Sequence, residues 1–193
     1  FALGIGKAAL MPFHRWLPAA MVAPTPVSAL LHAVAVVKAG VFSIVKVTIY
    51  IFGTDMVRTT DTVQWLLWVV GGTIIIASLV ALYQDNLKRR LAYSTISQLS
   101  YVILGAVLAN TSGIIGSVMH IATHAVGKIT LFFCAGAILI AAHKSEISEM
   151  DGLGRQMPFT MGAFLIASIS IVGLPPLGGV WSKWYLALGT LDA

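Results

Sequence analysis

The chain has 193 residues, of which 58% are hydrophobic and only 10% are charged, and its mean hydropathy is +0.91. A soluble domain carries roughly a quarter charged residues, so this composition excludes one and indicates an integral membrane protein. The formal net charge is +5, but the basic residues are dispersed along the chain, which argues against a nucleic-acid-binding patch. The one cysteine, Cys134, excludes an internal disulfide.

Apolar stretches of helical length follow one another along the chain and predict an all-α, polytopic transmembrane helix bundle. The six predicted helical segments cover residues 1–11, 27–52, 65–83, 90–109, 113–142 and 158–191. None of them has the apolar–polar alternation of a transmembrane β-barrel. Because the chain opens on Phe1 inside an apolar stretch, we interpret residues 1–193 as a fragment of one longer transmembrane domain.

Two of the predicted segments are irregular. At about 1.5 Å per residue, the segment 113–142 is roughly 45 Å long and exceeds a hydrocarbon core of about 30 Å, so it must tilt, kink or project. The segment 158–191 is interrupted at 173–179, where two prolines and three glycines cannot continue a regular helix. Discontinuous helices at membrane depth typically line a cavity or a transport site.

The charge of the connecting segments predicts the orientation in the membrane. By helix counting, the segments 12–26, 84–90 and 143–157 lie on one side, and they hold six basic residues. The segments on the other side hold only Arg58. Because lysine and arginine are enriched in cytoplasmic loops, the first side is predicted to be cytoplasmic.

Four lysines are the most unusual feature of the sequence. Lys7, Lys38, Lys128 and Lys183 lie in apolar stretches that contain no Asp or Glu. A charged amine within the membrane is costly, so such residues are rare and usually functional. Lys38 is predicted to lie roughly 16 Å along its helix, near the bilayer centre. A lysine near a helix end, such as Lys46, can instead extend its amine to the interface.

Three polar residues form one predicted stripe: His120, His124 and Lys128 are spaced at i, i+4 and i+8. Imidazole titrates near neutral pH, and a desolvated lysine loses its proton more easily, so the stripe can exchange protons. A polar contact between helices is the alternative interpretation, and it also applies to His32. A zinc site is not expected, because no intramembrane Cys, Asp or Glu nearby completes a ligand set.

Four stretches closely resemble the antiporter-like membrane subunits of respiratory complex I and the large subunits of Mrp-type cation/proton antiporters. They are GKAALMPFHRWLPAAMVAPTPVSALLHAVAVVKAG (6–40), DNLKRRLAYSTISQLSYVILG (85–105), HIATHAVGKITLFFCAGAIL (120–139) and GLPPLGGVWSKWYL (173–186). Membrane-bound hydrogenases carry the same type of subunit. The resemblance implies an inverted-repeat fold in which each half holds a discontinuous helix.

The resemblance also implies which residues act. The implied mid-membrane proton path consists of Lys7, His32, Lys38, His120, His124, Lys128 and Lys183. It implies that a partner glutamate lies on a helix before Phe1, which would explain the missing anions. We expect no catalytic residue, cofactor or metal in this chain, so any redox chemistry would belong to partner subunits.

The leading hypothesis is therefore a proton-translocating subunit of an energy-converting complex of the NADH-quinone oxidoreductase type, a translocase subunit with no redox site of its own. The alternatives are a subunit of a multi-subunit Na⁺(K⁺)/H⁺ antiporter or of a membrane-bound hydrogenase, and a structural subunit that does not conduct. The expected location is a bacterial or archaeal plasma membrane or an organellar inner membrane. Expected partners are lipid, other membrane subunits and protons, with Na⁺ or K⁺ under the antiporter alternative.

Overall fold

The structure, a computed structural model, describes residues 8–31 and 35–192, except for the side chains of residues 61–64. Its helices are α2 (Trp16–Ala19), η1 (Ala20–Val22), α3 (Thr25–Ala29), α4 (Val36–Lys46), η3 (Val47–Phe52), α5 (Thr54–Thr59), α6 (Asp61–Tyr83), α7 (Leu87–Leu108), α8 (Thr111–Ala142), η4 (Ile147–Glu149), α9 (Leu153–Gln156), α10 (Pro158–Val172) and α11 (Gly179–Leu191). The predicted all-α class is confirmed for these residues.

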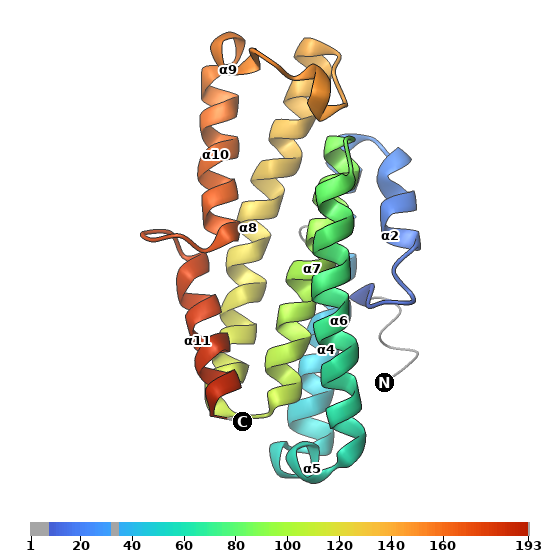
Figure 1. The fold of residues 1–193 in the computed structure, drawn as a ribbon, viewed down its shortest axis with the longest axis vertical. Coiled ribbons are helices and arrows are strands. Elements are labelled where there is room, and N and C mark those ends of the chain that lie inside the picture. Colours follow the sequence, from blue (N-terminus) through green and yellow to red (C-terminus); the bar gives the residue numbers. More distant parts are fainter. Residues whose placement is uncertain (1–7, 32–34, 193) are drawn as a thin grey trace.

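The long helices run side by side along the long axis of the bundle (Figure 1). α6, α7 and α8 follow one another up, down and up, and each packs against the next. α10 and α11 lie end to end along α8, and both contact it. α8 has 32 residues, and the 15 residues of α10 and the 13 of α11 both lie along it. A single long helix thus packs against both halves of the broken one.

The break between these two short helices is the predicted discontinuity, and the structure confirms it. α10 ends at Val172, and Gly173 adopts a left-handed conformation with φ of 87°, which glycine tolerates because it has no Cβ. The chain then leaves the bundle as a loop before α11 begins at Gly179 (Figure 1). The break lies at mid-height, beside the centre of α8.

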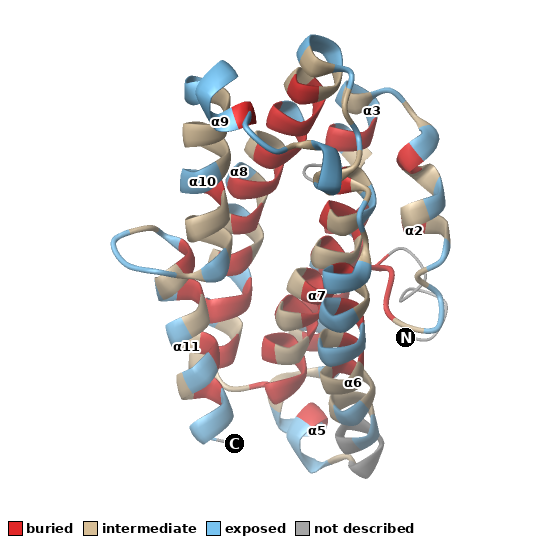
Figure 2. Ribbon diagram, turned by 45° about the horizontal axis from the view of Figure 1, so that its top comes forward, coloured by how far each residue is buried: buried red, intermediate tan, exposed pale blue. Residues whose placement is uncertain are grey.

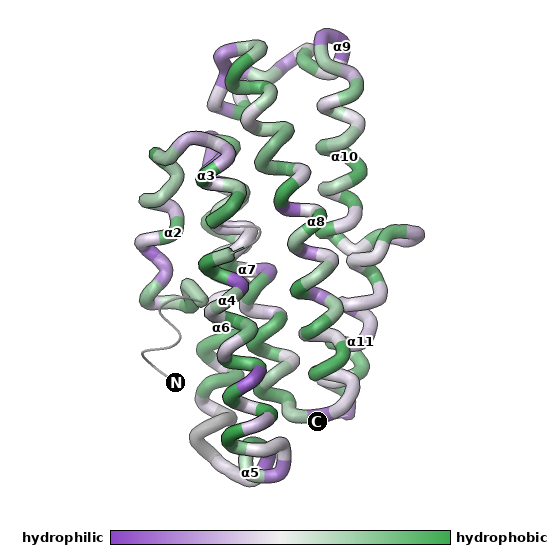
Figure 3. The backbone as a smooth tube through the Cα atoms, turned by 180° about the vertical axis from the view of Figure 1, so that it is seen from behind, coloured by the Kyte–Doolittle hydropathy of each residue, from purple (hydrophilic) through white to green (hydrophobic). Residues whose placement is uncertain are grey.

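Three helical stretches are long and apolar enough to cross a membrane: Trp65–Tyr83, Leu87–Leu108 and Thr111–Ala142. Hydrophilic colour gathers at the two ends of the bundle, and a few hydrophilic bands interrupt α8 at mid-length (Figure 3). Large apolar side chains such as Trp68 on α6 and Phe159 on α10 are exposed, as expected for surfaces that meet lipid or further helices.

Asparagine caps set the start of two helices earlier than the sequence predicted. α7 begins at Leu87 because Asn86 Oδ1 accepts a hydrogen bond of 3.2 Å from the Arg89 amide. α8 begins at Thr111 because Asn110 Oδ1 accepts one of 2.8 Å from the Gly113 amide. The predicted starts at residues 90 and 113 followed the apolar pattern, which these capping turns precede.

Two expectations about the first half of the chain are wrong. The residues 53–64, left between the predicted helical segments 27–52 and 65–83, contain α5 and the start of α6. Asp55 in the first turn of α5 and Arg58 in its last turn complement the helix dipole, so polar residues stabilise this helix rather than end it. The segment 27–52 is not one regular helix, since α4 begins only at Val36.

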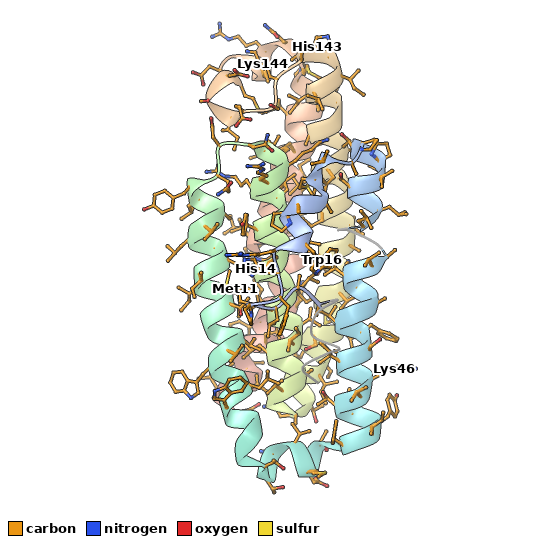
Figure 4. The ribbon with its side chains drawn as sticks, turned by 90° about the vertical axis from the view of Figure 1, so that its right-hand side faces the viewer. Met11, His14, Trp16, Lys46, His143 and Lys144 are labelled. Carbon is orange, nitrogen blue, oxygen red and sulfur yellow. The ribbon has the colours of Figure 1, made fainter. Side chains whose placement is uncertain are left out.

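The start of the described chain also differs from the predicted cytoplasmic connection at 12–26. Met11, His14 and Trp16 lie at mid-height of the bundle rather than at its end (Figure 4). Ala8, Ala9 and Leu10 are buried in the hydrophobic core between the helices. The chain therefore reaches the end of the bundle only after α2 and η1.

At that end of the bundle, the α6–α7 turn is bonded to the segment after α8. Ser148 donates from its hydroxyl and its amide to the Asp85 carboxylate, at 2.6 and 3.0 Å. These hydrogen bonds, led by that of the hydroxyl, hold the pKa of Asp85 below its ordinary value. The Leu87 amide donates to Ser145 O, and Asn86 Nδ2 donates to the Glu146 carboxylate. The two segments predicted to share the cytoplasmic side are thus adjacent.

Glycines allow α7, α8 and α11 to approach closely. A Cβ on Gly116 of α8 would lie 2.8 Å from the Leu186 amide nitrogen and 3.1 Å from Ser182 O of α11. A Cβ on Gly105 of α7 would collide with Ser117 and with the backbone of Gly113 on α8. These contacts fix α11 against α8 at the height where the polar residues lie.

Candidate functional site: a buried polar line along α8

Three polar residues of α8, spaced four residues apart, are buried in the centre of the bundle. His120 and His124 are each 2% exposed, and Lys128 is fully buried. The two imidazole rings stack, with centroids 5.8 Å apart and planes inclined by 27°. Buried residues follow α7 and the facing side of α8 through the same region (Figure 2). The stripe predicted at i, i+4 and i+8 therefore faces the interior of the protein.

Lys38 approaches this line from α4. Its Nζ donates a hydrogen bond of 2.6 Å to the carbonyl oxygen of Ile121, one residue after His120, and the side chain is only 6% exposed. Lys38 occupies the first turn of α4, rather than the middle of a continuous helix as predicted. It is nevertheless a buried amine, because α4 packs its first turn against the middle of the bundle.

Lys128 and Lys183 are also held by backbone carbonyls. Lys128 Nζ donates to Leu91 O of α7 at 3.1 Å. Lys183 Nζ donates to Val172 O at 3.0 Å, so the amine of α11 binds the carbonyl at the end of α10. The broken helix thus places a half-buried lysine against its own freed backbone. Together with Ile121 O, which binds Lys38, these are three neutral acceptors, and none carries a formal charge that would neutralise its amine.

His120 is bonded to the second half of the broken helix. Its Nδ1 lies 3.0 Å from Ser182 Oγ, and the same hydroxyl donates to Gly179 O at 3.0 Å. A hydroxyl has one proton to donate, so with that proton on Gly179 O the serine accepts from an Nδ1–H of His120. This assigns the tautomer of His120: Nε2 carries the lone pair that can accept a proton.

Some imidazole nitrogens have no protein partner. Neither Nδ1 nor Nε2 of His124, nor Nε2 of His120, bonds to a described protein atom. Buried polar atoms are normally hydrogen-bonded to protein or to internal water. The line therefore offers proton-accepting atoms that protein groups do not occupy.

Tyr101 of α7 contacts both Lys183 of α11 and the His120 end of the line. The Lys183 amine lies 5.7 Å from the centroid of the Tyr101 ring, within the range of a cation–π interaction. The edge of the same ring system meets His120, with centroids 6.2 Å apart. Tyr101 and Ser182 were not predicted as site residues. Their polar atoms follow no periodic pattern in the sequence. The signal that could have pointed to Ser182 is that it directly precedes Lys183.

A cleft of about 360 Å³ lies between α7, α8 and α10, beside the part of α8 that follows the polar line. It is lined by Arg90 and Met150 at the end of the bundle, and by Leu91 and Val172 deeper in the protein. The last two are the residues whose carbonyls bind Lys128 and Lys183. The cleft therefore extends from the end of the bundle to the backbone that holds both amines.

Five of the seven predicted path residues, Lys38, His120, His124, Lys128 and Lys183, lie on or beside this line. Lys7 and His32 fall outside the described residues. Lys46, predicted to extend its amine outward, is exposed on α4, 5.5 and 5.9 Å from the ring centroids of Phe42 and Tyr50. Figure 4 shows it on the outer side of the bundle. No group of three or more His, Cys, Asp or Glu in the described ranges could hold a metal ion.

A multi-pass helix bundle with a broken helix and a line of buried basic residues defines an antiporter-like membrane protein. The sequence comparison makes the assignment specific. The chain belongs to the NADH:quinone oxidoreductase/Mrp antiporter transmembrane family, whose model matches residues 1–193. The family resemblance expected from the motifs is therefore confirmed, and so is the integral, multi-pass location in a membrane.

Curated relatives are subunits of NADH-quinone oxidoreductases. The chain is 38% identical to NADH-quinone oxidoreductase subunit N of Desulforudis audaxviator, over 99% of the chain and 38% of that protein. It is 41% identical to subunit L of Rickettsia bellii, over 93% of the chain and 27% of that protein. The chain thus spans well under half the length of these relatives.

Two solved structures share the fold. An archaeal membrane-bound sulfane sulfur reductase superimposes with a TM-score of 0.85 at 30% identity, covering 97% of this chain and 38% of that chain. The Mrp complex from Dietzia sp. DQ12-45-1b superimposes with a TM-score of 0.91 at 27% identity, covering 98% of this chain and 35% of that chain. The relatives are subunits of multi-subunit membrane complexes.

Proposed function

We propose that the polar line on α8 conducts protons, and that the chain serves as part of a proton-translocating subunit in an energy-converting complex of the NADH-quinone oxidoreductase type. One observation carries this proposal. In the described part of the chain, Lys38, Lys128 and Lys183 each donate to a backbone carbonyl and to no carboxylate. Without a fixed counter-charge, a buried amine can gain or lose its proton when the local field changes.

The proposed path uses the geometry of the site. Protons would enter from the end of the bundle through the cleft that reaches Leu91 and Val172. They would pass by Lys128 and the stacked rings of His124 and His120, with internal water bonded to the free ring nitrogens. Ser182 and Lys183 would connect the line to the broken helix. Lys38, which binds the same stretch of α8, would add a further amine from the α4 side.

The partners of this activity are part of the proposal. Relatives named as NADH-quinone oxidoreductase subunits support an assembly with further membrane subunits, in which partner subunits would carry the redox chemistry. We propose that this chain binds none itself. The family resemblance further implies an acidic partner for Lys7 on a neighbouring helix. A change in that ion pair would shift the electrostatic field along the line and drive proton release.

A cation/proton antiporter is the second candidate function. The likeness to the Mrp complex from Dietzia, with a TM-score of 0.91, favours it. A hard cation prefers several oxygen ligands. The side chains of the polar line offer nitrogens and one serine hydroxyl, and the carbonyl oxygens beside them already accept from three lysine amines and from Ser182. This ligand chemistry supports protons as the ion on the described path.

Proton flux in vesicles tests the proposal with the full-length protein in its complex. Lys128→Ala and Lys183→Ala should each lower the flux by about a hundredfold, the scale lost when a positioned proton-transfer group is removed. Lys46→Ala, which removes an exposed lysine, should leave it unchanged. Native flux in either buried variant, with normal assembly, would reject the conduction path. A flux that requires Na⁺ or K⁺ on the opposite side would favour the antiporter.

A further inference from the structure

A second cavity lies away from the polar line, at the end of the bundle where α7 begins and α8 ends. Its volume is about 250 Å³. Three basic residues line it: Lys88 and Arg89 from the first turn of α7, and Lys144 from the segment after α8. Figure 4 shows Lys144 beside His143 at this end of the bundle. Residues from two distant parts of the sequence therefore concentrate positive charge in one cavity.

The three basic side chains of this cavity form no ion pair within the described part of the chain. No hydrogen bond or ion pair joins the side chain of Lys88, Arg89 or Lys144 to the described residues. The adjacent Arg90 contrasts with them, because its guanidinium donates to Ala81 O and Leu82 O at the end of α6. The Glu146 carboxylate, bonded to Asn86 Nδ2 and Ser145 Oγ at the edge of the cavity, is one nearby negative charge against these three positive ones. The positive N-terminal end of the α7 dipole adds to the potential.

The remaining wall of the cavity is apolar. Met21 of η1, and Ala135 and Leu139 of α8, line it alongside the basic residues. Ala135 and Leu139 belong to a helix that can span the membrane, so this wall continues from the end of the bundle into the apolar zone. A free phosphate has no apolar surface to bury against such a wall, whereas a phospholipid presents both a phosphate and an adjoining apolar chain.

We propose that this cavity binds the headgroup of an anionic phospholipid. The phosphodiester would lie among Lys88, Arg89 and Lys144, and the upper part of an acyl chain would lie along Ala135 and Leu139. Basic pockets between transmembrane helices at the membrane surface provide this kind of recognition. Bound lipid would bridge the start of α7 and the segment after α8, the two segments that the Asp85–Ser148 hydrogen bonds also join.

Native mass spectrometry of the delipidated full-length protein tests the site, with phosphatidylglycerol and phosphatidylcholine as probes. The native protein should bind one phosphatidylglycerol more tightly than phosphatidylcholine. Each removed cation should weaken that binding about fivefold, so Lys88→Gln with Lys144→Gln should weaken it about 25-fold. Arg155→Gln, which removes a charge at the same end of the bundle but outside the cavity, should have no effect. Lys88→Arg with Lys144→Arg should retain binding.

Three outcomes would overturn the proposal. Equal affinity of the native protein for both lipids would do so without any variant, even if the double variant fails to fold. Equal weakening by Arg155→Gln would mean that the surface attracts anions non-specifically. Displacement of the lipid by millimolar inorganic phosphate would assign the cavity to a soluble anion instead.

Discussion

Ser182 Oγ lies 3.0 Å from Nδ1 of His120, which bonds the second half of a broken helix to the polar line of α8. Because the serine proton goes to Gly179 O, this contact holds the Nδ1–H tautomer of His120. Nε2 is then the ring atom available to a passing proton, and no described residue forms a hydrogen bond with it. The position of α11 thus sets the chemistry of a residue on α8.

Ser182→Ala should release this tautomer. A net hydrogen-bond contribution of about 0.5–1.5 kcal/mol predicts that proton flux falls roughly two- to tenfold, less than for loss of Lys128. Nitrogen NMR of the imidazoles should show that the Nδ1–H form of His120 is no longer favoured. Ser43→Ala, at an exposed serine of α4 that bonds its own helix, is the matched control. An unchanged tautomer in Ser182→Ala would contradict the assignment.

His124→Ala should slow proton flux more at alkaline pH than at pH 6. At low pH, abundant protons can pass through water, whereas at high pH the relay group becomes limiting. Flux measured across the pH range in vesicles gives the comparison. Leu131→Ala removes a buried apolar side chain of the same helix and serves as the packing control. A loss that is the same at every pH would assign His124 a packing role.

Gly116→Ala should destabilise the contact between α8 and α11. The added Cβ would lie 2.8 Å from the Leu186 amide nitrogen, and backbone cannot move aside easily, so we expect a cost of about 1–3 kcal/mol. Gly162→Ala in α10 meets nothing within 4 Å, and should stabilise that helix by about 0.5–1 kcal/mol. Thermal unfolding in detergent measures both. A midpoint for Gly116→Ala at or above the native value would show that α11 is not closely packed there.

Ser148→Ala should lower stability in a pH-dependent way. The Ser148 hydroxyl lowers the pKa of Asp85 in the folded protein, so its contribution is present above the ordinary pKa near 3.9 and is lost as pH falls through the lowered value. The gap in unfolding midpoint between native and variant protein should therefore be present at pH 7 and close below about pH 4. Ser43→Ala should give a gap independent of pH. A Ser148→Ala gap that persists unchanged at low pH would mean that Asp85 is not the acceptor that matters.

Sequence periodicity was sufficient for much of the candidate site. The spacing of His120, His124 and Lys128 placed them on one stripe, and the apolar surroundings of Lys183 and the nearby prolines indicated a broken helix. Positions were less predictable where the chain departs from regular helix. Lys38 was assigned to a helix centre and lies in a first turn, because apolar composition does not reveal where a helix is interrupted.

The sequence by itself determined that this is a membrane helix bundle whose apolar stretches contain lysines without a nearby Asp or Glu. Composition and helical periodicity can be read from neighbouring residues along the chain, so no tertiary contact is needed to see them. Only the tertiary structure decided what those lysines bind. Ile121 O, Leu91 O and Val172 O are backbone atoms from other turns or helices, and every residue carries the same carbonyl. The hydrogen bond between His120 and Ser182 likewise joins residues 62 positions apart. It exists because small residues at Gly105 and Gly116 let three helices approach to contact distance.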